Sequence, residues 1–257
     1  MRMRKPLQLF FVFLSLNVWG QDLKSVERNL IQHYHRITDW KWSNAKGAYD
    51  SLESENEKFK NILLQCTSTI PATLTYPFDS LLAEVVTIST GINFTASTSP
   101  DKNFRIYSWD TWEGGTMHFF DNIVQYKIGD KVFSTILYRD EAEGDPGCFF
   151  STIYSAHLGG KTYYLAKYIS VLSSKDDYAG IRVFTIENGA LNDTISLIKT
   201  TAGLRNDIGY GFNHTGLALE YDDTNKVIKV PEVLDDGTTT NKFVEYKFTG
   251  NYFEEQK

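Results

Sequence analysis

The sequence predicts a mainly β protein that begins with a pair of helices. Three observations support this class. Apolar residues recur at helical spacing over residues 21–66, turn signals fall every 12 to 18 residues from about 100 to 250, and strand-forming residues fill the segments between the turns. The chain has 257 residues, of which 42% are hydrophobic and 14% aromatic, so it has enough apolar side chain to bury a core.

Residues 1–20 have the features of a secretory signal peptide. Three basic residues occur within the first five positions, residues 7–18 are almost wholly apolar, and a small residue, Gly20, precedes Gln21. The apolar run is shorter than the roughly 20 residues that span a bilayer, which argues against a membrane anchor. We therefore expect cleavage before Gln21, no integral membrane segment in the mature chain, and a periplasmic or extracellular location.

The charge of the mature chain restricts its partners. Removal of residues 1–20 takes away three basic residues and no acidic ones, which leaves 23 Lys and Arg against 32 Asp and Glu, a net charge of −9. An acidic protein is poorly suited to bind nucleic acid or an anionic lipid surface. We expect neither as the main partner.

The chain has two cysteines, Cys66 and Cys148. In an oxidising compartment an even pair favours a disulfide, which here would close a loop of about 82 residues. The alternative is two separately buried thiols, which are common in protein cores. The sequence favours the bridge only slightly, because no spacing rule identifies partners this far apart.

Residues 21–80 are predicted to form an N-terminal helical region. A second helix is expected to begin near Asp50, where Asp50 and Glu53 resemble an N-cap and its reciprocal acid. Pro71 and Pro77 are then expected to end the helical region. The predicted buried face of the first helix, with Lys24, Glu27 and Arg28 opposite to it, consists of Leu23, Val26, Leu30, Tyr34 and Ile37.

Residues 81–257 are predicted to form an antiparallel β-meander of about a dozen strands. Four two-residue turn signals, at which Gly or Asn accepts a positive φ, are Gly129-Asp130, Gly159-Gly160, Asn188-Gly189 and Gly250-Asn251. A long meander has to protect its edges, and the long loops and tight turns favour a β-propeller-like arrangement. The alternatives are a β-sandwich and an up-and-down barrel.

One predicted hairpin, "FRIYSWDTWEGGTMHFF" at residues 104–120, carries the candidate binding residues. Aromatic rings stack on the apolar faces of sugars, and acidic or imidazole groups bind hydroxyls, so the hairpin predicts a site for a glycan or a protein partner. Packing and turn chemistry are the structural alternative, in which Tyr107 and Trp109 pack against a second sheet, Asp110 bonds to its own turn, and Gly114 and Gly115 supply positive φ. The candidate residues are Tyr107, Trp109, Asp110, Trp112, Glu113 and His118.

Two other functions stay open. Asp110 and Glu113 are the pair of carboxyl groups that a glycan-directed hydrolase would need, and burial of Trp109 and Trp112 would instead indicate a structural envelope component. The sequence contains no zinc-protease, zinc-finger, EF-hand, nucleophile-elbow, phosphate-loop or dinucleotide motif. We therefore predict no metal, no cofactor and no assigned catalytic residue, and we favour a binding module over an enzyme.

The chain also resembles a set of exported, β-rich bacterial proteins of unknown role. The resemblance extends from about residue 50 to residue 253, and it depends on "SPDKNFRIYSWDTWEGGTMHFFDNIVQYK" with the flanking segments "LESENEKFKNILLQCTSTIPATLTYPF" and "YKFTGNYF". The residues that carry it within the hairpin are Arg105, Tyr107, Trp109, Asp110, Gly114, Gly115 and His118. The resemblance implies export and a β-rich fold, and it implies no activity.

Overall fold

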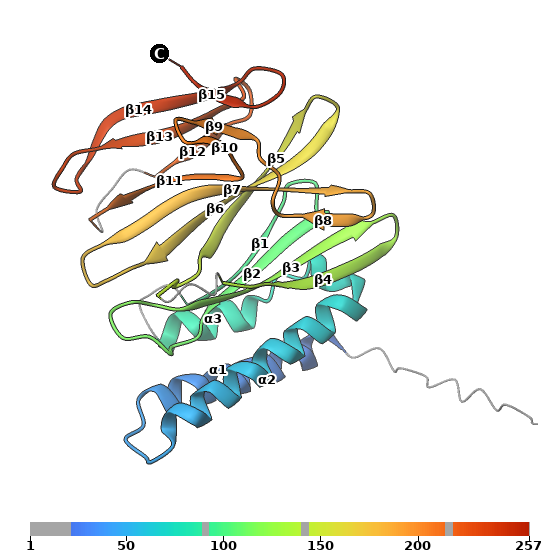
Figure 1. Ribbon diagram of the computed structural model, residues 1–257. Coiled ribbons are helices and arrows are strands. Elements are labelled where there is room, and N and C mark those ends of the chain that lie inside the picture. Colours follow the sequence, from blue (N-terminus) through green and yellow to red (C-terminus); the bar gives the residue numbers. More distant parts are fainter. Residues whose placement is uncertain (1–21, 89–92, 140–143, 214–217, 257) are drawn as a thin grey trace, which may run out of the picture.

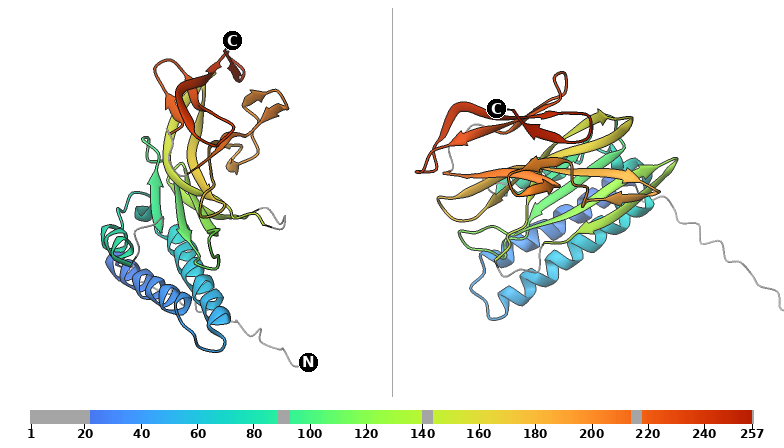
Figure 2. Two further views of the ribbon diagram at one scale, coloured as in Figure 1. Left: turned by 90° about the vertical axis from the view of Figure 1, so that its left-hand side faces the viewer. Right: turned by 45° about the horizontal axis from the view of Figure 1, so that its top comes forward.

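A computed structural model of the chain describes residues 22–88, 93–139, 144–213 and 218–256. The described residues form three α-helices, one short 3₁₀ helix and fifteen strands. They are arranged in layers: helices cover one face of a first sheet, a second sheet packs on the other face, and a third sheet packs on the second (Figures 1 and 2). The predicted signal peptide lies outside the described residues.

The predicted helical pair is confirmed. Helix α1 (Leu23–Lys41) is joined by residues 42–47 to helix α2 (Ala48–Thr69), and the two lie side by side (Figure 1). Helix α2 begins two residues before the predicted Asp50, because Gly47 adopts a left-handed φ of 80° at its start.

The prediction that helical structure ends at Pro71 and Pro77 is wrong. A 3₁₀ helix, η1 (Pro71–Leu74), begins at the first proline, and helix α3 (Asp79–Ile88) follows the second. Proline fits the first turn of a helix, where its missing N–H has no partner to lose. The helical region therefore continues past residue 80, and the first strand begins at Phe94.

Glu27 connects these helices, although the sequence placed it on the exposed face of α1. Its side chain is buried, and its carboxylate accepts hydrogen bonds from the Tyr76 hydroxyl at 2.7 Å and from the backbone N–H of Leu81 at 2.9 Å. The second contact satisfies a free amide in the first turn of α3. Hydrophobic periodicity alone does not detect such a tertiary contact.

Three sheets contain all strands of the described residues, and most neighbouring strands are antiparallel. Sheet A has the order β1-β2-β3-β4: β1 (Phe94–Thr98), β2 (Phe104–Asp110), β3 (Phe120–Ile128) and β4 (Lys131–Leu137). Sheet B has the order β11-β7-β6-β5, with β8 also paired to β7: β5 (Phe149–Leu158), β6 (Lys161–Val171), β7 (Asp177–Glu187), β8 (Ala190–Asn192) and β11 (Asp207–Phe212).

Sheet C contains the C-terminal strands and two short strands that precede β11. Its order is β10-β9-β15-β14-β13-β12: β9 (Ile198–Thr200), β10 (Gly203–Arg205), β12 (Glu220–Asp222), β13 (Val227–Val233), β14 (Thr239–Phe248) and β15 (Phe253–Glu255). Strand β15 runs parallel to β9, which is the one parallel pair among the described strands.

The propeller-like arrangement predicted from the turns is wrong: the described strands form neither a propeller nor a closed barrel. Three of the four predicted two-residue turns are confirmed, since they join β3 to β4, β5 to β6 and β7 to β8. At Gly250-Asn251 the hairpin forms, but four residues, 249–252, separate β14 from β15. Two pairs depart from a meander because they join strands that are not consecutive in the chain: β11 pairs with β7, and β15 pairs with β9. Turn residues determine local pairing, and they contain no information about these long-range neighbours.

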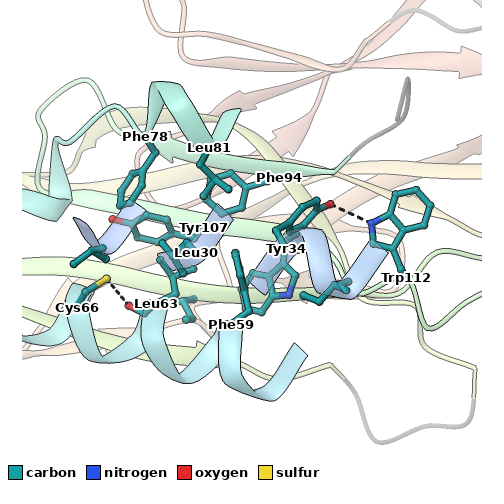
Figure 3. Packing of buried hydrophobic residues seen from close by; sticks show 14 of the residues in the cluster. Leu30, Tyr34, Phe59, Leu63, Cys66, Phe78, Leu81, Phe94, Tyr107 and Trp112 are labelled. Atoms are coloured by element: carbon teal, nitrogen blue, oxygen red, sulfur yellow. Dashed lines mark hydrogen bonds between the residues drawn. The ribbon is translucent and has the colours of Figure 1, made fainter. Parts of the chain in front are cut away.

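The layers enclose three hydrophobic cores. One lies between the helices and sheet A, and Figure 3 shows its packing around Leu30, Phe59 and Tyr107. A second lies between sheets A and B, where the rings of Phe104 and Tyr164 stack at 4.5 Å. The third lies between sheets B and C. Within the described residues, no helix is long and apolar enough to cross a bilayer.

The disulfide predicted between Cys66 and Cys148 is not formed; both cysteines are free. Cys66 lies in the core between the helices and sheet A, and its thiol donates to the carbonyl oxygen of Leu63 at 3.2 Å (Figure 3). Cys148 packs against the core on the other face of sheet A. The sheet thus lies between the two sulfurs, and a bridge needs Cα atoms within about 7 Å. Burial raises the pKa of the Cys66 thiol to about 12.

Candidate functional site

Strand β2, the first half of the candidate hairpin, is buried at all seven positions. Its side chains alternate as the sequence predicts, because successive residues of a strand point to opposite faces of the sheet. Phe104 and Ile106 enter the core between sheets A and B, whereas Tyr107 and Trp109 enter the core under the helices. This strand therefore belongs to the framework of the protein.

Tyr107 and Trp109, two of the predicted binding residues, have no exposed surface. The Trp109 ring lies 5.3 Å from that of Phe59 on α2, measured between centroids. The Tyr107 hydroxyl lies 2.8 Å from the carbonyl oxygen of Thr73 and 2.9 Å from Oε1 of Gln125. A ligand cannot stack on either ring, so both have structural roles.

The loop between β2 and β3, residues 111–119, begins with an Asx turn. Oδ1 of Asp110 accepts the backbone N–H of Trp112 at 2.8 Å, as the turn alternative predicts. The prediction that Gly114 and Gly115 supply positive φ is wrong, since the positive φ of 58° belongs to Trp112. Gly114 is required for another reason: a Cβ at this position would lie 1.9 Å from the carbonyl oxygen of Met117.

This loop packs against the C-terminal end of α1 and encloses a small pocket of about 180 Å³, which we call the His118 pocket. Lys41, the last residue of α1, donates a hydrogen bond through Nζ to the carbonyl oxygen of Gly114 and holds the two elements together. The pocket is lined by Lys41, Trp42, Asp110, Trp112, Gly114, Gly115, Met117 and His118.

Two tryptophans form the aromatic wall of the His118 pocket. Trp42, the C-cap residue of α1, is 72% exposed, and its ring lies 6.3 Å from that of Trp112 between centroids. Trp112 is largely buried, and its indole N–H donates to the Tyr34 hydroxyl at 3.1 Å (Figure 3). Trp109 and Trp112 are therefore both buried, the outcome that favours a structural role at these two positions, and Trp42 is the ring of this wall that presents an open face.

His118 is oriented in this wall by Asp110. Nδ1 of the imidazole lies 2.6 Å from Oδ2 of Asp110, whose side chain is 1% exposed, whereas the His118 side chain is 31% exposed. The hydrogen bond to the carboxylate raises the pKa of His118 above its usual value, against the effect of partial burial. Nε2 has no hydrogen-bond partner among the described residues, so it is the ring nitrogen left for a ligand.

Glu113 is engaged outside the His118 pocket. One carboxylate oxygen of Glu113 lies 3.8 Å from the Arg139 guanidinium and accepts the Thr111 hydroxyl at 3.3 Å, and the residue does not line the His118 pocket. Burial, together with the nearby Asp121 carboxylate, raises the pKa of Glu113. Asp110 is inaccessible and Glu113 is turned toward Arg139, so the two carboxyl groups do not converge on one open cleft.

Sequence reasoning missed Lys41 and Trp42 as site residues. Trp42 lies in the polar segment "DWKWSNAKG". This segment has no repeating apolar pattern that would place Trp42 on a buried face, so the side chain is a candidate for exposure. No local signal places this segment beside a loop some 70 residues away. That neighbourhood depends on how α1 packs across sheet A.

The His118 pocket combines groups that can contact a bound molecule. It offers an aromatic face, a directed imidazole nitrogen and the exposed backbone of Gly115. No group of three or more His, Cys, Asp or Glu side chains is placed to hold a metal ion within residues 22–88, 93–139, 144–213 and 218–256. No family model, curated protein or solved structure matches the chain.

Proposed function

We propose that the protein is an exported binding module that recognises a glycan through the His118 pocket. The observation that carries the proposal is Trp42, an indole ring that is 72% exposed beside a pocket whose polar group is already oriented. Small-molecule sites are concave and lined by aromatic side chains with a few placed polar groups, which is the combination that this pocket has. In this proposal the apolar face of a sugar ring stacks on Trp42 and a hydroxyl binds Nε2 of His118.

The size of the pocket limits what it encloses. Its 180 Å³ is smaller than the roughly 300–1,000 Å³ of pockets that enclose a drug-sized molecule. We infer that one sugar ring enters, as the terminal or protruding unit of a longer glycan. Most of such a ligand would stay outside, so we expect modest affinity for a free monosaccharide.

The arrangement favours binding over hydrolysis. A glycosidase needs two carboxyl groups that both reach the glycosidic bond. Asp110 is buried and occupied by His118 and Trp112, and Glu113 is engaged by Arg139. The hydrolase alternative therefore has no pair of accessible carboxyl groups in this hairpin.

A glycan array tests the proposal. The mature chain is applied to neutral and acidic oligosaccharides beside the variants Trp42→Ala and Tyr49→Ala. Tyr49, on the first turn of α2, is 60% exposed and does not line the pocket, so its variant is the matched control. We expect Trp42→Ala to lose the signals that Tyr49→Ala retains.

Two results would contradict the proposal: no glycan retained by the wild-type chain, or glycans retained equally by Trp42→Ala. Both variants change exposed side chains, so we expect their free energies of unfolding to stay within about 0.5 kcal/mol of wild type. Thermal unfolding of each variant separates loss of binding from loss of folding.

A protein partner is the second candidate, and the exposure of both Trp42 and Tyr49 near one end of the helical pair supports it. Tryptophan and tyrosine are enriched among the residues that contribute most to protein interfaces. This alternative predicts that Tyr49→Ala weakens binding along with Trp42→Ala. A glycan site predicts that Tyr49→Ala has no effect.

A further inference from the structure

A second pocket, larger than the first, lies where sheets A and B meet. Its volume is about 300 Å³, and we call it the Arg182 pocket. The end of β4, the start of β5, the middle of β7 and the segments after β8 and β10 form its walls. It is lined by Asn122, Leu137, Tyr138, Arg139, Asp145, Gly147, Cys148, Phe150, Arg182, Asp193, Thr194 and Asn206.

Arg182 forms no ion pair within 4.0 Å among the described residues, although Asp207 is its cross-strand partner on β11. Within the same residues its one hydrogen-bond contact is a long one of 4.0 Å from Nη2 to Sγ of Cys148. Its Nε is buried without a partner, and the guanidinium lies 5.7 Å from the centroid of the Tyr168 ring.

Arg139, in the same pocket, shows the contrast. Its guanidinium lies 3.4 Å from the carboxylate of Asp121 and 3.8 Å from that of Glu113. Its charge is thus neutralised within the protein. Arg182 is the cation of this pocket that is available to a ligand.

The Arg182 guanidinium, which is half-buried and has no ion pair among the described residues, is suited to bind an anion. It presents N–H groups in a planar fork that matches a carboxylate or a phosphate, and a partly desolvated charge gains most from such a partner. Because Arg182 extends from the central part of β7 and stacks on Tyr168, its position is fixed before a ligand binds.

The acidic residues that line the pocket indicate whether it would bind a carboxylate or a phosphate. Asp145 and Asp193 line the pocket, and their negative charges would repel a phosphate dianion more strongly than a single carboxylate. Oδ1 of Asp145 already accepts the backbone N–H of Gly147 at 2.9 Å, so Asp193 supplies the carboxylate oxygens that can accept a hydrogen bond from a hydroxyl group. Tyr138, which is 79% exposed, adds an aromatic face beside them.

We propose that the Arg182 pocket binds a sugar acid of monosaccharide size. Its carboxylate would pair with the Arg182 guanidinium, a hydroxyl would donate to Asp193, and its ring would lie against Tyr138. The volume of 300 Å³ is at the lower limit for small-ligand pockets, which suits one such ring. This site is independent of the His118 pocket, and neither proposal needs the other.

Isothermal titration of the mature chain tests the proposal with four ligands: glucuronate, glucose, serine and inorganic phosphate. We expect glucuronate to bind at least about tenfold more tightly than glucose, since a charge-assisted hydrogen bond contributes about 1.5–3 kcal/mol. We also expect its affinity to fall as salt is added. Equal binding of glucuronate and glucose would overturn the proposal, as would tighter binding of serine or phosphate.

Variants assign the interaction to the pocket. Arg182→Gln is expected to lower the affinity for glucuronate about tenfold or more. Arg28→Gln, which removes the same charge from the exposed surface of α1, is expected to change it less than twofold. Because Arg182→Gln changes a half-buried residue, Tyr138→Ala provides a second variant on an exposed side chain, with an expected loss of several-fold. The site would be refuted if Tyr138→Ala bound glucuronate as tightly as wild type and if Arg182→Gln, while folded, also retained its affinity for glucuronate.

Discussion

Strand β2 and the loop that follows it contain the same kinds of residue, yet the structure uses them differently. In the strand, the polar groups other than the Trp109 indole N–H are bonded inside the protein: Arg105 donates to the carbonyl oxygens of Thr73 and Tyr76, and the Ser108 hydroxyl donates to Asn122. Asp110, at the end of the strand, holds His118 of the loop and leaves one imidazole nitrogen without a partner among the described residues. A candidate site can therefore be told from a core by polar atoms that have no partner in the protein and that border a pocket. The types of residue present do not make this distinction.

The two tryptophans Trp109 and Trp42 illustrate this difference. Trp109 has no exposed surface, and its indole N–H is buried without a partner among the described residues. Trp42 is mostly exposed and contributes little to the core. The first stabilises the fold by burying apolar area, and the second is available to a ligand at little cost to the fold.

The largest expected effect comes from the strand side of this comparison. Trp109→Ala leaves a cavity beside Phe59 and should lower the free energy of unfolding by about 3–5 kcal/mol, the usual range for a buried tryptophan. Chemical denaturation measures it. Trp109→Phe retains most of the ring and removes the unpaired N–H, so we expect a clearly smaller loss. Equal losses for the two variants would contradict the packing described here.

A smaller effect is expected from the loop. His118→Gln removes the hydrogen bond to Asp110, and at pH 6 we expect it to cost about 1.5–3 kcal/mol, the range for bonds to charged groups. The pKa of His118 is raised in the folded protein, so the interaction is fully present below the unfolded pKa of about 6.5 and is lost as the pH rises through the folded pKa.

The difference in stability between wild type and His118→Gln should therefore shrink from pH 6 to pH 9. Denaturation curves of both proteins across this range measure it. The neighbouring charges act in opposite directions on this titration, because Asp177 favours the imidazolium and Lys41 disfavours it. A difference that stays constant with pH would show that His118 does not form a charged pair with Asp110.

The sequence predicts the local parts of the fold well and the long-range parts poorly. Helical periodicity places Leu30, Tyr34 and Ile37 on the buried face of α1, and the turn residues place the β3–β4 and β5–β6 hairpins. These features depend on neighbours in the chain. The stacking of three sheets, the β9–β15 pair and the contact of Glu27 with α3 depend on packing between distant segments.

In the candidate site, too, local features are predicted from the sequence and contacts between distant segments are not. The alternation in β2 and the Asx turn at Asp110 are predicted, because both are set within a few residues. The His118 pocket also needs Trp42 from the end of α1, and nothing near residue 42 indicates that partner. The disulfide failed as a prediction for the same reason: two cysteines carry no information about which side of a sheet each one occupies.

The most direct test of the central claim is an NMR titration that follows the indole N–H signals of Trp42 and Trp109 as the best glycan from the array is added. We predict that the Trp42 signal and the imidazole signals of His118 shift with increasing ligand, while the signal of Trp109 stays in place. Shifts confined to residues outside the His118 pocket, with Trp42 and His118 unchanged, would contradict the assignment of binding to this loop.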